Sequence, residues 1–185
     1  MSACGLAFGA AFFGGRPTLP DDSCCTRCST SRTDPPCSAA CFASEIAIGA
    51  ASGMGAILMM IMGLLKSGDH VILSRSMFGS TLNLFAKEFG KFGVETTFVS
   101  QTDVAEWRAA VKPNTKLLFA ETPTNPLTEV CDIAALAALA HDAGALLAVD
   151  NCFAAPVLQK PLALGADVVI HSGTEFLDGQ GRVMA

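Results

Sequence analysis

From about residue 45 to the end, short runs rich in β-branched and aromatic residues alternate with longer runs whose apolar residues have helical spacing. No other feature of the sequence constrains the fold as strongly. The run Leu146–Val149 is apolar at every position, which is typical of a strand buried on both faces. These patterns predict an α/β fold: a three-layer sandwich in which helices cover both faces of a mostly parallel sheet.

Turn-forming residues such as Gly68, Pro113 and Gly144 separate the predicted elements. In parallel sheets, the polar residues of a functional site gather where strands end. Asp150 follows one predicted strand and Ser172 follows the next, so we expect their side chains to lie close together. The predicted strands are 70–73, 96–99, 116–120, 146–149 and 167–171, and the predicted helices are 54–66, 81–92, 104–111 and 133–143.

Residues 1–44 differ from the rest in composition, being rich in Ser, Thr, Pro, Arg and Cys. One interpretation is a zinc site, because Cys25-x-x-Cys28 and Cys37-x-x-x-Cys41 have spacings that occur among thiolate ligands. Their flanks lack the periodicity of strands or helices that would position four thiolates. We therefore expect no metal, and we expect a disordered or non-native leader. A GC-rich gene read out of frame also gives such a composition.

The overall composition limits the partners that we expect. A net charge of -5 and a pI of about 5.1 provide no basic surface for nucleic acid. The longest apolar run, 54–65, is too short to span a bilayer and contains Gly55 and Gly63, so we expect no membrane association and a cytoplasmic location. The mean hydropathy of +0.45 is high, which favours a homo-oligomer or an aggregation-prone chain with apolar surface to cover.

Three short motifs have both a functional and an ordinary interpretation. Ser52 and Gly53 precede the predicted helix that begins at Met54, and exposed amides at a helix start can bind a phosphate, although an ordinary N-cap has the same sequence. Asp150 could stand against a protonated ring nitrogen, or it could simply be a turn residue. Phe78 could stack on a planar cofactor or pack in the core.

Two other polar groups have structural interpretations. His171 lies within an apolar strand, where a hydrogen-bonded core histidine is the expected role. Cys152 has no helix start or basic residue beside it in sequence that would lower the pKa of its thiol, so we expect it to be structural.

Four stretches of the chain, taken together in their order, form one pattern. They are Ala51-Ser52-Gly53-Met54, Glu121-Thr122-Pro123-Thr124-Asn125-Pro126, Val149-Asp150-Asn151 and the run from His171 through Arg182. This pattern resembles the pyridoxal 5'-phosphate (PLP) dependent transsulfuration enzymes of cysteine and methionine metabolism, from about residue 45 to the end. It is most similar to the cystathionine γ-synthase and O-succinylhomoserine sulfhydrylase group, and Phe78 before Gly79 favours the sulfhydrylase branch.

The resemblance implies the large domain of the aspartate-aminotransferase fold (fold type I) and PLP as the cofactor. It implies that amides at a helix start and two hydroxyls hold the phosphate, and that an aromatic ring stacks on the pyridine. It also implies an asparagine near the ring hydroxyl and an aspartate at the ring nitrogen. The corresponding cofactor-binding positions are Ser52, Gly53, Met54, Phe78, Asn125, Asp150, Ser172 and Thr174.

The family carries its Schiff-base lysine directly after Ser172-Gly173-Thr174, where this chain has Glu175. A carboxylate cannot bond to the cofactor aldehyde, so Glu175 is not competent at this catalytic position. The family reaction removes an O-acyl group from the γ carbon of an activated homoserine and adds a thiol or sulfide, with the lysine moving protons. We therefore expect a chain of this lineage, built for an amino-acid substrate, that is inactive as written.

The alternative is a non-catalytic fragment or pseudoenzyme that at most binds PLP or pairs with an intact paralogue. The family's N-terminal Tyr and Arg, which reach the phosphate of the neighbouring subunit, have no counterpart in residues 1–44. Its C-terminal domain would lie beyond Ala185. The resemblance thus predicts that residues 45–185 form a partial PLP-binding large domain.

Overall fold

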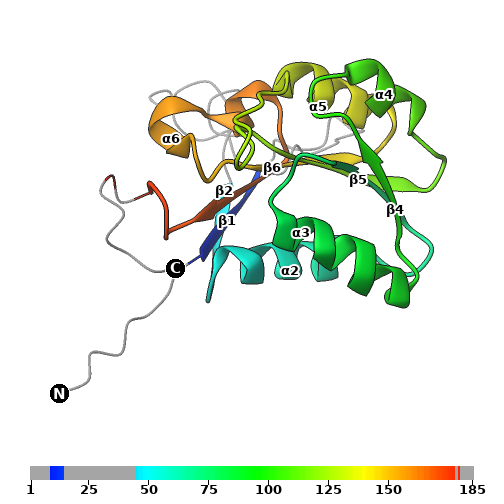
Figure 1. Cartoon of the computed structure of the whole chain (residues 1–185), viewed down its shortest axis with the longest axis horizontal. Coiled ribbons are helices and arrows are strands. Elements are labelled where there is room, and N and C mark those ends of the chain that lie inside the picture. Colours follow the sequence, from blue (N-terminus) through cyan, green and yellow to red (C-terminus); the bar gives the residue numbers. More distant parts are fainter. Residues whose placement is uncertain (1–8, 15–44, 178, 180–185) are drawn as a thin grey trace, which may run out of the picture.

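The computed structural model describes residues 9–14, 45–177 and 179, and its described part is built on one sheet of seven strands. The strand order is β2-β1-β7-β6-β5-β3-β4, and the neighbours from β7 to β4 are all parallel (Figure 1). The first two strands of this order are β2 (Glu45–Ala50) and β1 (Gly9–Gly14). The parallel strands are β3 (His70–Ser74), β4 (Glu95–Val99), β5 (Thr115–Glu121), β6 (Leu146–Asp150) and β7 (Val168–Ser172). Each of the five predicted strands is confirmed, with every end within one residue of the prediction.

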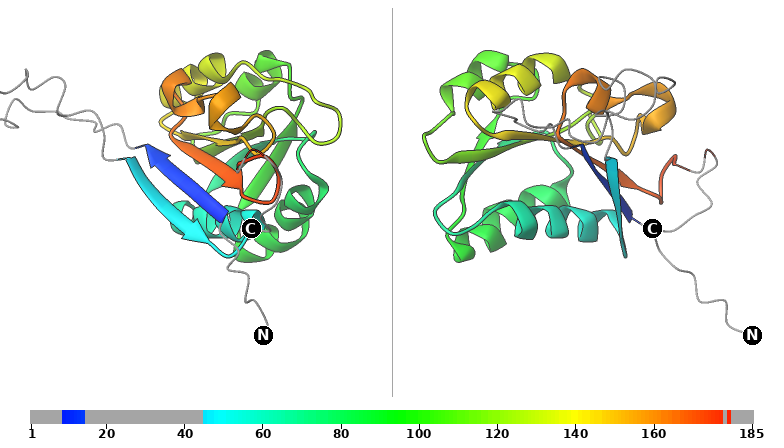
Figure 2. Two further views of the ribbon diagram at one scale, coloured as in Figure 1. Left: turned by 90° about the vertical axis from the view of Figure 1, so that its left-hand side faces the viewer. Right: turned by 180° about the vertical axis from the view of Figure 1, so that it is seen from behind.

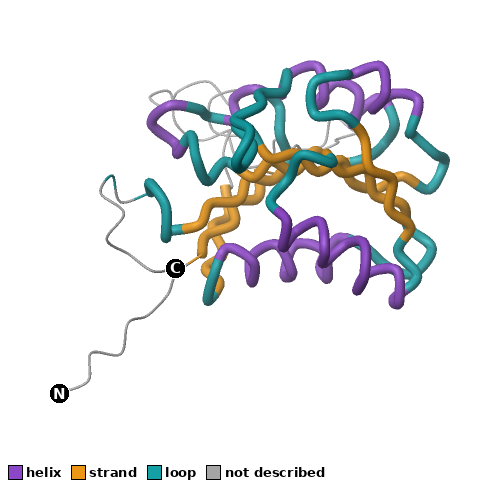
Figure 3. The backbone as a smooth tube through the Cα atoms, viewed as in Figure 1, coloured by secondary structure: helices purple, strands orange, loops and turns teal. Residues whose placement is uncertain are grey.

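Helices cover both faces of the sheet, as predicted for a three-layer sandwich (Figure 3). Helices α2 and α3 lie on one face, and α4 and α5 lie on the other (Figure 1). The predicted helix 81–92 is an α-helical segment followed by a π-helical turn (84–88) and a 3-10 turn (89–92). The α-helices are α2 (Gly53–Leu64), α3 (Gly79–Asn83), α4 (Val104–Ala109), α5 (Ile133–Asp142) and the short α6 (Ala155–Leu158).

The periodicity of α2 explains how it packs. Ser52 caps its first turn, since the Ser52 hydroxyl oxygen accepts the backbone N–H of Gly55 at 3.0 Å. Counted from Ala56, the other buried side chains of this helix lie one, four and five positions later, so all of them share one face of the helix. That face packs on the sheet, in one cluster with side chains of β3, β5 and β7. The buried residues of α2 are Ala56, Ile57, Met60 and Ile61.

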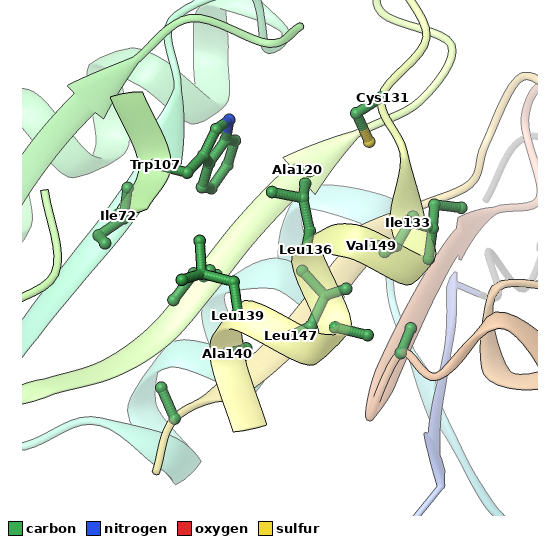
Figure 4. Close-up of a cluster of buried hydrophobic side chains, with 14 of the residues drawn as sticks. Ile72, Trp107, Ala120, Cys131, Ile133, Leu136, Leu139, Ala140, Leu147 and Val149 are labelled. Atoms are coloured by element: carbon green, nitrogen blue, oxygen red, sulfur yellow. The ribbon is translucent and has the colours of Figure 1, made fainter. Parts of the chain in front are cut away.

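Each central strand contributes to two cores, which accounts for its continuous apolar sequence. Side chains alternate between the faces of a strand, so Val71 and Leu73 join the cluster under α2 whereas Ile72 joins the cluster under α4 and α5. The second cluster surrounds Trp107, which is fully buried and donates its indole N–H to the carbonyl oxygen of Ser100 at 2.8 Å (Figure 4). The sheet is therefore the middle layer of the fold, with one apolar cluster on each face.

The edge of the sheet differs from the prediction. Gly9–Gly14 forms strand β1, which pairs antiparallel with β7 and with β2 (Glu45–Ala50), and Figure 2 shows β1 and β2 side by side. The disordered or non-native leader expected over 1–44 therefore does not describe this segment. Its backbone satisfies hydrogen-bonding groups that would otherwise be unpaired at the edge of β7. Among the described residues, no helix has the length and apolar character needed to cross a membrane.

The two cysteine pairs considered as zinc ligands, Cys25/Cys28 and Cys37/Cys41, lie outside the described residues. The rest of the predicted leader, 1–8 and 15–44, also lies outside them, so the description of this region as a leader stays a prediction.

Candidate functional site

The carboxyl ends of β5, β6 and β7 meet the start of α2 around a cavity of about 380 Å³. This is the edge of the sheet where the sequence predicted a site. Every candidate residue taken from the sequence lines this cavity: Ser52, Gly53, Met54, Phe78, Asn125, Asp150, Ser172, Thr174 and Glu175.

The start of α2 lies directly against the end of β7. A methyl group on Gly53 would stand 2.9 Å from the Cβ atom of Ser172, so only glycine allows this approach. Beside it, the backbone N–H of Thr174 donates to the hydroxyl of Ser172 at 3.3 Å. The arrangement places two hydroxyl-bearing residues next to the amides of a helix start, which is the chemistry that binds a phosphate.

Asp150 ends β6 and is only 7% exposed. Its Oδ1 atom accepts the backbone N–H of Cys152 at 3.1 Å. Burial raises the pKa of the Asp150 carboxyl, and the charge of Glu175 adds to this rise. Because burial disfavours the charged form of this carboxyl, a cationic partner would stabilise it. The protonated nitrogen of an aromatic ring is such a partner.

Glu121 is a site residue that the sequence analysis quoted only as part of a motif. It ends β5, is 3% exposed and lines the same cavity. Its carboxylate accepts the backbone N–H of Phe78 at 2.6 Å and that of Asn125 at 3.1 Å. Burial, followed by the charge of Asp150, raises its pKa to about 7. An acidic residue that ends an apolar strand was the signal that could have identified it.

The ring of Phe78 is 43% exposed and forms part of the cavity wall. The alternative that Phe78 packs in the core therefore does not hold. Cys152 also lines the cavity, and its sulfur accepts the backbone N–H of Ser172 at 2.9 Å. Burial and the neighbouring Asp150 raise the pKa of the Cys152 thiol, so it stays protonated at neutral pH and is a poor nucleophile.

His171 precedes Ser172 in β7 but does not line this cavity; it lines a second one of about 280 Å³. It is 3% exposed, and burial lowers the pKa of its imidazole. This agrees with a structural role. Lys160, the lysine nearest to Glu175 in the sequence, lines the second cavity together with His171.

Three carboxylates therefore line the candidate site, contributed by Glu121, Asp150 and Glu175. None of the described residues around the cavity is a lysine, an arginine or a histidine. The Oε2 atom of Glu175 is buried and has no hydrogen-bond partner among the described residues. Such an atom is costly unless a ligand supplies a donor.

Comparison with known proteins identifies the lineage. The model of the Cys/Met metabolism PLP-dependent enzyme family matches residues 39–185. The chain belongs to this family. The family's cofactor is PLP, its members act on amino-acid substrates, and the resemblance drawn from the sequence motifs is confirmed.

Individual relatives agree with the family match. The chain is 61% identical over 141 residues to an O-succinylhomoserine sulfhydrylase of Pseudomonas aeruginosa, covering 76% of this chain and 35% of that protein. It is 44% identical over 142 residues to an L-methionine gamma-lyase of Fusobacterium nucleatum, covering 76% and 36%. The crystal structure of metB from Corynebacterium glutamicum aligns with a TM-score of 0.69 at 45% identity, covering 72% of this chain and 34% of that one. The chain thus spans about a third of the length of these relatives.

The cavity of this PLP-family chain fits its cofactor in part. The close approach of Gly53 to Ser172 leaves a helix start open to a phosphate, and the buried carboxylate of Asp150 suits a protonated ring nitrogen. The covalent attachment does not fit, because Glu175 offers no amine and no other described residue that lines the cavity offers one.

Proposed function

We propose that this cavity holds PLP by non-covalent contacts alone, in a chain of O-succinylhomoserine sulfhydrylase lineage that does not carry out γ-replacement as written. The observation that carries the proposal is Glu175, which lines the cavity at the position of the family's Schiff-base lysine. Without that amine, the chain lacks both the covalent anchor and the proton carrier of the family reaction.

Each remaining contact has a candidate in the cavity. The amides of Gly53 and Met54, with the hydroxyls of Ser172 and Thr174, would hold the phosphate. Phe78 would stack on the ring, because it is partly exposed and lines the cavity. When bound, the cofactor supplies an electron sink, which an anion at its ring nitrogen strengthens; Asp150 would be that anion. The two further cavity carboxylates would oppose the phosphate, so we expect weak binding.

The substrate class follows from the relatives and is part of the same proposal. The relative from Pseudomonas aeruginosa is an O-succinylhomoserine sulfhydrylase, which suggests an O-acyl homoserine as the amino acid for which this cavity was built. We expect no turnover of such a substrate by the chain as written, because no cavity amine is available to move protons between its carbon atoms.

Borohydride reduction in the presence of PLP, followed by intact-mass and peptide mass spectrometry, tests the proposal. We expect equilibrium dialysis to detect bound PLP while reduction fixes none of it within the cavity. Stoichiometric fixation on a lysine of the unaltered chain, with loss of binding when that lysine is replaced, would show that the active site lies elsewhere. The proposal would also be contradicted if PLP did not bind, or if its binding did not depend on Gly53.

The surface of α6 favours a second role, association with another copy or with an intact paralogue. Val157 and Leu158 are 90% and 82% exposed, which is unusual for adjacent aliphatic residues. We expect sedimentation analysis to show self-association that the double substitution Val157→Asp/Leu158→Asp weakens. Phe92→Asp, at an exposed position in the 3-10 turn 89–92, is the control. A monodisperse monomer at micromolar concentration would rule out association with another copy.

A further inference from the structure

We infer that Glu175 turns this cavity into a site that prefers the amine form of the cofactor, pyridoxamine 5'-phosphate, to the aldehyde form. The inference rests on the proposed function, because it requires that the cavity binds this class of phosphorylated pyridines. It goes further by naming the form that the altered residue selects.

The first argument is the charge of the cavity wall. Glu121 and Asp150 are 3% and 7% exposed, and Glu175 adds a third carboxylate, while no described lining residue is cationic. The two buried carboxyls both have raised pKa values, to which the charge of Glu175 contributes. A ring substituent that carries a positive charge therefore relieves a repulsion that a neutral substituent leaves in place.

The second argument is the hydrogen-bonding state of each acid. Both oxygens of Glu121 accept backbone N–H groups, and one oxygen of Asp150 accepts the N–H of Cys152. In contrast, the buried Oε2 of Glu175 accepts no hydrogen bond from any described residue. Glu175 is thus the carboxylate with the greatest need for a donor.

A metal ion is a poorer occupant than an ammonium group. Coordination requires several ligands around one point, and the described residues contain no group of three or more His, Cys, Asp or Glu residues able to hold a metal ion. An ammonium group needs only one carboxylate within reach and supplies three donors.

The forms of the cofactor differ at a single substituent of the ring. That substituent is an aldehyde in PLP, an alcohol in pyridoxine 5'-phosphate and a protonated aminomethyl group in pyridoxamine 5'-phosphate. Contacts with the phosphate and the ring are common to all three forms and cancel in a ratio of dissociation constants. Since the family's lysine bonds to this aldehyde carbon, the residue at its position is the one placed to sense the substituent.

A charge-assisted hydrogen bond contributes about 1.5 kcal/mol or more, which corresponds to a factor of about ten in a dissociation constant. We therefore expect the chain to bind pyridoxamine 5'-phosphate at least about tenfold more tightly than pyridoxine 5'-phosphate. The alcohol is the reference because, unlike the aldehyde, it cannot react with surface lysines.

Isothermal titration of the full chain with the three ligands, in parallel with Glu175→Gln and Glu88→Gln, tests the inference. Glu175→Gln keeps the size of the side chain and removes its charge, and it should abolish the preference. Glu88 is 51% exposed and pairs with Lys91, so its substitution should leave the preference intact. Circular dichroism checks that each variant is folded.

The possible outcomes separate the two proposals. Equal affinities for the amine and the alcohol would overturn the preference and leave the proposed function standing. A preference that survives in Glu175→Gln would overturn its assignment to Glu175. If no ligand binds the unaltered chain, the proposed function itself fails, and the inference fails with it.

Discussion

The carboxylate of Glu121 accepts the backbone N–H of Phe78 at 2.6 Å, across forty-three positions of sequence. Its other oxygen accepts the N–H of Asn125 at 3.1 Å, so one buried side chain ties together two loops of the cavity. Glu121 therefore positions an aromatic wall residue and a polar one at the same time.

Replacing Glu121 should change how stability depends on pH. The pKa of Glu121 is raised from 4.5 to about 7, so between these values the folded protein holds a proton that the unfolded chain has released. Stability therefore falls as pH rises through this window, by up to about 3 kcal/mol. Urea unfolding at pH 5 and pH 8 should show that Glu121→Gln lacks this fall in the free energy of unfolding. A difference between variant and parent that does not change with pH would contradict the prediction.

Gly53→Ala should destabilise the fold and weaken phosphate binding. The added methyl group would lie 2.9 Å from the Cβ of Ser172 and force the start of α2 away from β7, at a cost of about 1–3 kcal/mol. Gly63→Ala is the matched control in the same helix, since nothing lies within 4 Å of the new methyl group. It should stabilise by about 0.5–1 kcal/mol. Thermal unfolding measures both variants, and equal shifts of the two unfolding temperatures would disprove the packing argument.

Glu175→Lys should restore covalent attachment of PLP. The new amine would enter the cavity at the family's position, where three carboxylates become two and the unpartnered Oε2 atom is removed. We expect an absorbance change on adding PLP, and borohydride should fix the cofactor on residue 175. Fixation on Lys160 instead would show that the second cavity is the reactive one.

Trp107→Ala should cost about 3–5 kcal/mol, because Trp107 is fully buried among the side chains of α5 and the sheet. Trp107→Phe should cost less, since it keeps most of the volume and loses the hydrogen bond to Ser100. Phe92→Ala, which removes a ring that is 62% exposed, should have little effect. Urea unfolding, followed by far-ultraviolet circular dichroism, ranks the three variants by their loss of stability. Equal losses of stability for all three would refute the prediction.

The sequence predicted the central part of the fold well because its strands are marked by local features. Leu146–Val149 is apolar at every position, its neighbouring strands have apolar centres, and turn residues separate them from the helices. Neither signal needs tertiary information. The meeting of Asp150 and Ser172 followed from the rule that parallel strands end at one edge.

The features that were not predicted from the sequence depend on contacts between distant parts of the chain. The pairing of Gly9–Gly14 with β7 joins segments more than a hundred residues apart, and its short apolar run lies within an otherwise irregular composition. An acidic residue at the end of an apolar strand marks Glu121 as a candidate, but its role arises from its bond to Phe78, a contact between distant parts of the chain. The hydrogen bond from the backbone N–H of Ser172 to the Cys152 sulfur is another contact between residues far apart in the sequence.

Trp107 is the single tryptophan of the chain, and the chain has no tyrosine. It lies in the cluster under α4 and α5, whereas the cavity borders Met54 and Ile57 of α2. Intrinsic fluorescence therefore arises from one indole that does not line the ligand cavity. Its emission will follow loosening of the layer opposite α2, and it provides a built-in control that distinguishes a variant with a damaged site from one that has unfolded.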